Sequence, residues 1–255
     1  MTQQPFTFTY IISYRHSADR LNNLRRVLEW INGFSGVEVI VVEQDKHSKL
    51  KEFNLRCKHI FLKSAMPFNK SWGFNVGLKY SNSQVIVFGD SDLIMDPDKF
   101  ISSINMLSQY EMVNPYYSVI DLNAQESSLA YPQMSQIDRP GRGETDIQKV
   151  PLCGGICIFR REAIEKIGGW HEDFIGWGGE DDFQSVKVKA LLSWHENKAA
   201  KCYHLFHERT APDMRWYQRN LQLLQKLSVM SPEDLKKVIA NVSPKSGMKF
   251  KYDTF

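Results

Sequence analysis

The chain has 255 residues, carries a formal net charge of +3 and is 42% hydrophobic. Its length fits one large domain or two small ones, and its hydrophobic share is sufficient for a packed core. A charge so close to balance, without a long basic run, argues against a nucleic-acid partner. No apolar stretch reaches the roughly 18 residues that span a bilayer, so we expect membrane contact to be peripheral at most.

Four cysteines, none in a C-x-x-C arrangement, and the lack of a signal-like N-terminal pattern favour a reduced, cytoplasmic protein. We expect a single catalytic domain over residues 1–230. Residues 231–255 are rich in lysine. They are expected to form a basic C-terminal appendage, which could touch the anionic inner face of a membrane.

The N-terminal part predicts a parallel βαβ unit. Residues 7–13 (TFTYIIS) form a β-branched and aromatic run that is typical of a buried strand. Ser17 can then cap a helix in which apolar residues recur at helical spacing up to Ile31. A second strand follows over residues 37–42. A strand, a helix and a strand joined by short links favour a parallel pair.

The rest of the sequence alternates strand and helix patterns, as an α/β domain requires. Residues 121–149 are polar with few large aliphatic side chains, and they predict a long, mobile loop. The other elements are predicted in chain order: a short strand near residues 61–62, a helix over 71–80, a strand over 85–88, a helix from Asp96 to about Leu107, and helices over 161–167 and 180–192.

Two carboxylates follow the strand predicted over residues 85–88, in the order Asp90, Ser91, Asp92. Residues i and i+2 of an extended segment point the same way, so both carboxylates can face one pocket. Their hard oxygens suit Mn²⁺ or Mg²⁺, which a sugar-nucleotide diphosphate needs to offset its charge. A solvated turn at the end of a strand is the competing interpretation.

Two histidines follow the run Cys202-Tyr203, at positions His204 and His207. Imidazole is a good ligand for Mn²⁺, and these side chains could complete a carboxylate site. Histidines at this spacing are also common as structural or surface residues. The spacing therefore leaves both interpretations open.

A tryptophan and two glycines precede three acids in residues 177–182 (WGGEDD). Acids at a helix N-terminus are favoured by the helix dipole, so capping would explain them in part. One carboxylate could instead act as general base on an acceptor hydroxyl. Trp177 could stack on the apolar face of a sugar ring, or it could belong to the core.

Taken together, these motifs resemble β-1,4-galactosyltransferases, and more widely the group that includes chondroitin polymerases and polypeptide N-acetylgalactosaminyltransferases. The similarity extends from about Thr7 to Arg209. Motifs that occur jointly are more specific than any one alone. The matching segments are Phe68-Asn69-Lys70, Asn75-Val76-Gly77, residues 87–93 (VFGDSDL), Gly154-Gly155, Gly168-Gly169-Trp170, residues 176–182 (GWGGEDD) and His207.

The resemblance implies a GT-A fold, an α/β architecture with a mixed central sheet flanked by helices. It also implies transfer of a sugar from UDP-Gal or UDP-GalNAc to a glycan, with Mn²⁺ as the metal. The metal ligands that it implies are Asp92, His207, His204 and Asp90. The donor contacts that it implies are Arg15, Glu43 or Asp45 for the uracil, Phe68, Lys70, Asp90, Ser91, Leu152, Gly155 and Trp177.

On the acceptor side, the resemblance implies a site made by Trp177, Gly178, Gly179, Glu180 and Asp181. Asp181 would be the base, with Glu180 beside it. The Glu-Asp-Asp form resembles the inverting enzymes of the group, which predicts a β-linked product from an α-linked donor. The expected role of such an enzyme is the synthesis of a surface polysaccharide.

Two departures from the family pattern carry predictions. Leu152 stands where the galactosyltransferases have a tyrosine that crowds the C2 substituent of the sugar. We therefore expect UDP-GalNAc to be accepted at least as well as UDP-Gal. His204 stands where they use a methionine ligand. A harder ligand predicts a less strict dependence on Mn²⁺, with Mg²⁺ tolerated.

Two other functions fit parts of this sequence. A catalytically silent sugar-nucleotide-binding module or partner subunit would keep the donor residues, but the intact Asp181 and both histidines argue against it. A nucleotidyltransferase also joins an α/β sheet to a metal. Such enzymes usually have a Gly-rich phosphate loop near the N-terminus, whereas the first strand here leads into residues 13–16 (SYRH).

Overall fold

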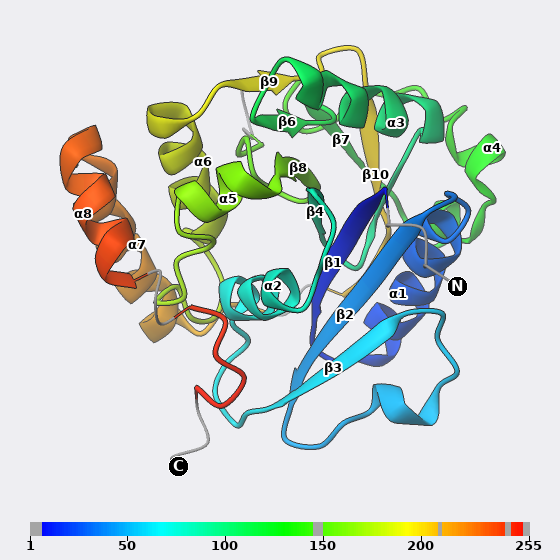
Figure 1. Ribbon diagram of the computed structural model, residues 1–255. Coiled ribbons are helices and arrows are strands. Elements are labelled where there is room, and N and C mark those ends of the chain that lie inside the picture. The colour runs from blue at the N-terminus through cyan, green and yellow to red at the C-terminus, as the bar shows by residue number, and fades with distance from the viewer. Residues whose placement is uncertain (1–6, 145–149, 209–210, 243–245, 252–255) are drawn as a thin grey trace, which may run out of the picture.

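The computed structural model describes residues 7–144, 150–208, 211–242 and 246–251. They form a seven-stranded sheet and a three-stranded sheet with helices packed around them (Figure 1). The strands are β1 Phe8–Tyr14, β2 Val37–Asp45, β3 Lys58–Lys63, β4 Val85–Gly89, β5 Leu93–Met95, β6 Met112–Asn114, β7 Ser118–Asp121, β8 Cys157–Arg160, β9 Trp194–Glu196 and β10 Lys201–His204. The helices are α1 Ala18–Ile31, α2 Lys70–Lys79, α3 Pro97–Asn105, α4 Tyr131–Met134, α5 Arg161–Lys166, α6 Glu180–Leu191, α7 Met214–Ser228 and α8 Pro232–Val242, with 3-10 turns η1 Leu50–Glu52, η2 Met106–Ser108 and η3 Glu126–Ser128.

The large sheet is mixed, in the order β3-β2-β1-β4-β8-β6-β9. Strands β3, β2, β1 and β4 run parallel, and β8 runs antiparallel to both of its neighbours. The βαβ prediction is confirmed, and the Ser17 side chain caps α1 by accepting from the Arg20 amide. The mixed α/β sheet that was expected is also present.

Alternation along β1 distributes its side chains between two cores. Tyr10 and Ile12 pack in one buried cluster with Leu24 of α1, whereas Ile11 packs in another with Phe74 of α2. Because successive side chains of a strand point to opposite faces, α1 and α2 cover opposite sides of the sheet. The continuous apolar runs of these strands follow from burial on both faces.

The small sheet has the order β5-β10-β7. Strand β10 runs antiparallel to β5 and parallel to β7. In this register His204 lies opposite Leu93 of β5 and opposite Asp121 of β7. The sequence analysis did not find these strands, because each is three or four residues long and shows no hydrophobic period.

Two short helical turns interrupt the long loop that was predicted over residues 121–149. Turn η3 and helix α4 lie within it, and Arg139 forms an ion pair with Glu126 at 2.6 Å. The amide of Arg142 donates to the Val119 carbonyl at 2.8 Å. The polar residues that suggested a loop bond to one another instead. Residues 145–149 lie outside the described residues.

The C-terminal region is anchored to the rest of the protein in its described part. Leu235 of α8 is 1% exposed and packs with Phe174, Phe183 and Leu227. Further along, the Gly247 amide donates to Glu172 at 2.6 Å. The described part of the lysine-rich region therefore packs against the rest of the protein. In the described part of the chain, no helix combines the length and apolar character needed to cross a membrane.

We expect Leu235→Ala to lower the free energy of unfolding by about 2–4 kcal/mol, because it leaves a cavity between three helices. Val229→Ala is the matched control, since Val229 is 82% exposed. It should cost about 0.5 kcal/mol or less. Urea unfolding of both variants measures the difference. Equal losses would show that α8 does not share the core.

Candidate metal centre and adjoining acidic cluster

Three side chains from distant parts of the sequence converge at one end of the small sheet. The ligand atoms of Asp92, His204 and His207 all lie within 4.8 Å of one another. Asp92 Oδ2 is 3.4 Å from His207 Nε2 and 3.8 Å from His204 Nε2. Asp92 is held in place because its carbonyl accepts from the Leu205 amide at 2.8 Å. Two imidazoles and a carboxylate are a donor set that divalent transition metals accept.

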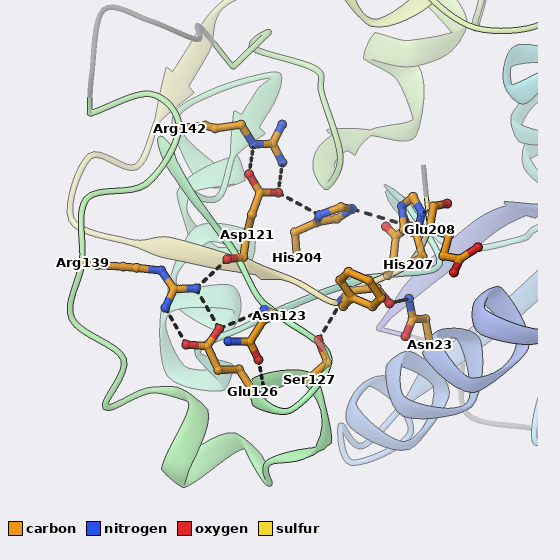
Figure 2. A network of polar contacts seen from close by, with 12 residues as sticks. Asn23, Asp121, Asn123, Glu126, Ser127, Arg139, Arg142, His204, His207 and Glu208 are labelled. Atoms are coloured by element: carbon orange, nitrogen blue, oxygen red, sulfur yellow. Dashed lines mark hydrogen bonds and ion pairs between the residues drawn. The ribbon is translucent and has the colours of Figure 1, made fainter. Parts of the chain in front are cut away.

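Both histidines have a hydrogen-bond partner on the far side of the ring (Figure 2). His204 Nδ1 lies 2.9 Å from Asp121 Oδ1, and His207 Nδ1 lies 3.0 Å from the Glu208 carbonyl. Both acceptors require a proton on Nδ1, and this arrangement directs the Nε2 atom of each ring toward Asp92. Metal-binding histidines are commonly oriented in this way, and the residues present therefore fit a divalent cation.

The two histidines open onto a hollow of about 490 Å³. It is lined by Asp121, Leu122, His204, Phe206, His207 and Glu208. Side-chain exposures of 12% to 17% for Asp92, His207 and His204 leave the group shielded but reachable. Asp121 was not found by the sequence analysis. It and Asp92 raise the pKa of His204 to about 9, against the effect of burial.

Asp90 belongs to a second cluster, centred on Lys70. Lys70 Nζ lies 2.9 Å from Asp90 Oδ1 and 3.0 Å from Asp181 Oδ1. Lys70 opens α2, whose first turn is capped by the Asn69 side chain. Although Asp90 was also expected near the metal, it lies against Lys70 and outside the group of three. One ammonium group thus joins the acidic motif of residues 90–92 to the acidic motif of residues 180–182.

Burial and opposing charges set the protonation of this cluster. Burial disfavours the ammonium of Lys70, but Asp181, Asp90 and Glu180 outweigh it and hold the pKa of Lys70 well above its usual value. Burial and the like charges of Glu180 and Asp90 raise the pKa of Asp181 to about 8, although Lys70 opposes the rise. A carboxylate with a raised pKa beside a fixed cation is suited to exchange a proton near neutral pH.

The residues expected on the acceptor side lie in the loop before α6 and in its first turn. Gly179 precedes the helix with φ of 90°, and an added Cβ would meet the Phe174 ring at 2.8 Å. Trp177 is 64% exposed, and its ring centroid lies 5.3 Å from that of Tyr217 in α7. Glu180 Oε2 is buried and has no hydrogen-bond partner among the described residues. An unsatisfied acceptor therefore lies beside Asp181, and an exposed aromatic ring lies in the loop that precedes it.

Two of the expected donor residues lie together near the end of β1. The Arg15 guanidinium lies 5.9 Å from the Phe68 ring centroid and donates to the Gln44 and Met66 carbonyls. Gly155 has φ of 83° and lies against the Tyr116 hydroxyl, so a side chain there would be strained and would collide. Ser91 is buried between the two acids of its motif.

Other expected donor residues are less open. Glu43 is fully buried, and its carboxylate accepts from Ser48, the Lys49 and Leu50 amides and His59. Those bonds leave Asp45, at the half-buried end of β2, as the more accessible of the two acids. Leu152 is 4% exposed and packs in the cluster that contains Phe74.

Sequence comparison assigns the family. The sequence model of glycosyl transferase family 2 matches residues 10–168, more than half of the chain. The chain belongs to glycosyl transferase family 2. A second model, described as the N-terminal domain of galactosyltransferase, matches residues 145–208. In this family 2 chain the two regions meet at the site, because Asp92 lies in the first and both histidines lie in the second.

The curated relatives match part of their own length. The chain is 27% identical over 149 residues to β-1,4-galactosyltransferase 4 of Mus musculus, which covers 56% of this chain and 36% of the relative. It is 28% identical over 120 residues to β-1,4-galactosyltransferase 5 of Danio rerio, which covers 46% and 25%. The chain therefore spans at most 36% of the length of either relative.

Solved structures share the fold. The structure of GalNAc-T7 with UDP, GalNAc and Mn²⁺ has a TM-score of 0.62 at 14% identity, over 99% of this chain and 57% of that chain. S. aureus TarS 1–349 with UDP-GlcNAc has a TM-score of 0.59 at 11% identity, over 92% and 71%. The catalytic domain of Drosophila β-1,4-galactosyltransferase 7 with xylobiose has a TM-score of 0.55 at 16% identity, over 89% and 83%. The expected GT-A fold and the resemblance to galactosyltransferases are confirmed.

Proposed function

We propose that this protein is a metal-dependent, inverting glycosyltransferase that moves Gal or GalNAc from a UDP-sugar to a hydroxyl of a growing polysaccharide. The observation that carries the proposal is the convergence of Asp92, His204 and His207 beside an open hollow. Asp90, two residues from Asp92, contacts Lys70, and Lys70 in turn contacts Asp181. A metal position and a candidate base therefore adjoin each other.

Asp92, His204 and His207 would hold the cation. A bound Mn²⁺ would supply positive charge that offsets the diphosphate and stabilises the departing UDP. The fold likeness to GalNAc-T7, whose structure contains UDP, GalNAc and Mn²⁺, supports this metal. Lys70 adds a second positive charge beside the same acidic motif. Two carboxylates hold its ammonium group in place, which would fix the direction of a hydrogen bond that it donates to a phosphate oxygen.

Asp181 would act as the general base. In an inverting displacement the acceptor oxygen forms a bond to C1 of the sugar while the bond from C1 to the diphosphate oxygen breaks. The proton of the acceptor hydroxyl passes to Asp181, and the bonding electron pair leaves with UDP. The buried Glu180 Oε2, without a partner among the described residues, can accept a hydrogen bond from the acceptor. Trp177 offers an exposed ring for the sugar face.

We expect UDP release from UDP-Gal or UDP-GalNAc, with mixed oligosaccharide acceptors, to require a divalent metal and to stop in EDTA. Asp92→Asn should lower turnover at least about 100-fold, because it removes a charged ligand. Asp98→Asn, at an exposed position in the first turn of α3, is the matched control.

His204 stands where the galactosyltransferases use a methionine, which is a softer ligand. The wild type should therefore retain part of its Mn²⁺-dependent rate when Mg²⁺ is supplied instead, and His204→Met should lose that part.

Absence of turnover with every donor, while UDP still binds, would contradict the enzyme assignment and favour a sugar-nucleotide-binding module. If replacing Mn²⁺ by Mg²⁺ lowers the turnover of the wild type and of His204→Met by the same factor, the argument about His204 as a ligand is contradicted. The enzyme assignment would then still stand.

The pH profile tests the base. Only deprotonated Asp181 can take a proton, and its pKa is raised to about 8. We therefore expect kcat/KM to increase as the pH rises through about 8. Asp181→Asn should lose about 10²–10⁴-fold in kcat and abolish this increase. Asp182→Asn, the exposed neighbour in the same turn, should retain both. A flat wild-type profile, or an α-linked product by NMR, would contradict this mechanism.

For the donor, we propose that Leu152 allows an N-acetyl group at C2, so that UDP-GalNAc is used at least as well as UDP-Gal. Leu152→Tyr should lower the ratio of kcat/KM for UDP-GalNAc to that for UDP-Gal by about 10-fold or more. Leu152→Met keeps the volume and should keep the ratio. Because Leu152 is buried, melting temperatures are compared in parallel. An unchanged ratio in a folded Leu152→Tyr variant would contradict the proposal.

A further inference from the structure

We propose that Asp121, fixed by Arg142, is a positioning residue that orients His204 and strengthens it as a metal ligand. This inference rests on the metal centre of the proposed function. It extends that centre to the segment between β7 and residue 144, which none of the motifs includes. The segment had been expected to be a mobile loop, and its arginines instead hold a carboxylate against the metal site.

The backbone places the two side chains next to each other. Asp121 ends β7 and His204 ends β10, and the two are paired in the parallel register of the small sheet. Asp121 Oδ1 lies 2.9 Å from His204 Nδ1. The contact joins residues far apart in the sequence, but it is set by a strand pairing. It does not depend on a flexible surface side chain finding its partner.

Two arginines restrain Asp121, one at each end of the residue (Figure 2). Arg142 Nε lies 2.9 Å from Asp121 Oδ2, and its Nη2 lies 3.1 Å from Oδ1. Arg139 Nη2 donates to the Asp121 carbonyl at 2.6 Å and is itself held by Glu126. Arg142 is anchored because its backbone exchanges two hydrogen bonds with Val119, at 2.8 and 2.9 Å. The ion pair and hydrogen bond from Arg142 hold the Asp121 carboxylate, while Arg139 holds its carbonyl.

The peptide between the two histidines is also fixed. The Phe206 amide donates to Ser127 Oγ at 2.7 Å, and the Phe206 carbonyl accepts from Asn23 at 3.0 Å (Figure 2). The backbone over residues 204–207 is therefore held from both sides. The remaining freedom of His204 is the rotation of its ring, and the bond to Asp121 removes it.

The two histidines differ in the charge of their partner. His207 Nδ1 faces a backbone carbonyl of the next residue, whereas His204 Nδ1 faces a carboxylate. A carboxylate acceptor raises the electron density on the opposite nitrogen, which makes Nε2 the stronger donor to a cation. Removing such a partner typically weakens metal binding about 10–100-fold.

The test is Mn²⁺ affinity without turnover, measured from free Mn²⁺ by electron paramagnetic resonance on the full chain. Asp121→Ala should weaken Mn²⁺ binding about 10–100-fold. Asp121→Asn keeps an acceptor but loses the charge, so it should weaken binding less. Arg142→Met should give a smaller loss, since Arg139 still holds the backbone. Asp138→Ala removes a carboxylate that is 97% exposed in the same segment and should leave affinity unchanged.

UDP affinity measured in EDTA distinguishes a positioning role of Asp121 from a merely structural one. It should be the same in all four variants. Wild-type affinity for Mn²⁺ in folded Asp121→Ala, or in Asp121→Asn should the alanine variant not fold, would overturn the inference and leave the proposed function intact. Failure of the wild type to bind Mn²⁺ would overturn the metal centre, and the inference with it.

Discussion

The pairing of β10 with β5 and β7 is the constraint on which the candidate site depends. It places His204 opposite Leu93, next to Asp92, and opposite Asp121 in one register. A shift of one residue would turn every side chain of β10 to the other face of the sheet. The backbone bond from Leu205 to Asp92 extends the pairing to the metal position. The site is thus determined by main-chain hydrogen bonds before any side chain contributes.

Lys70 is the second requirement, because three acids surround it. Asp90, Asp181 and Glu180 could not lie so close together as carboxylates without a cation among them. The ammonium balances them only in part, so burial and the remaining like charges of Glu180 and Asp90 raise the pKa of Asp181. Under the proposed function the same imbalance would serve catalysis, since a base must hold a proton briefly and release it near neutral pH. Structural balance of charge and the proposed catalytic role would then use the same residues.

Much of the large sheet was predictable from the sequence, whereas the small sheet was not. The runs of β1, β2 and β4 are apolar over several residues, and α1 shows a cap and a helical period. Strands β5, β7 and β10 are too short to show a period. The histidines and Asp92 could be named from local motifs. Asp121 could not, because its partner lies 83 residues away and an isolated acid in a polar segment carries no signal. The polar composition of residues 121–144 suggested a loop for the same reason: ion pairs such as Arg139–Glu126 are visible only in three dimensions.

Under the proposed function, the metal side and the acceptor side of the site are built with different rigidity. The metal side is held by strand pairing, by two oriented histidines and by the arginines around Asp121. The acceptor side depends on a loop with positive φ at Gly176, Gly178 and Gly179, and on an exposed Trp177 that contacts Tyr217. Glycines at such angles allow backbone changes that other residues resist. A preorganised metal and donor side avoids the entropic cost of ordering at each turnover. An adaptable acceptor side can close once a sugar offers its face to Trp177, which excludes water from the reacting carbon.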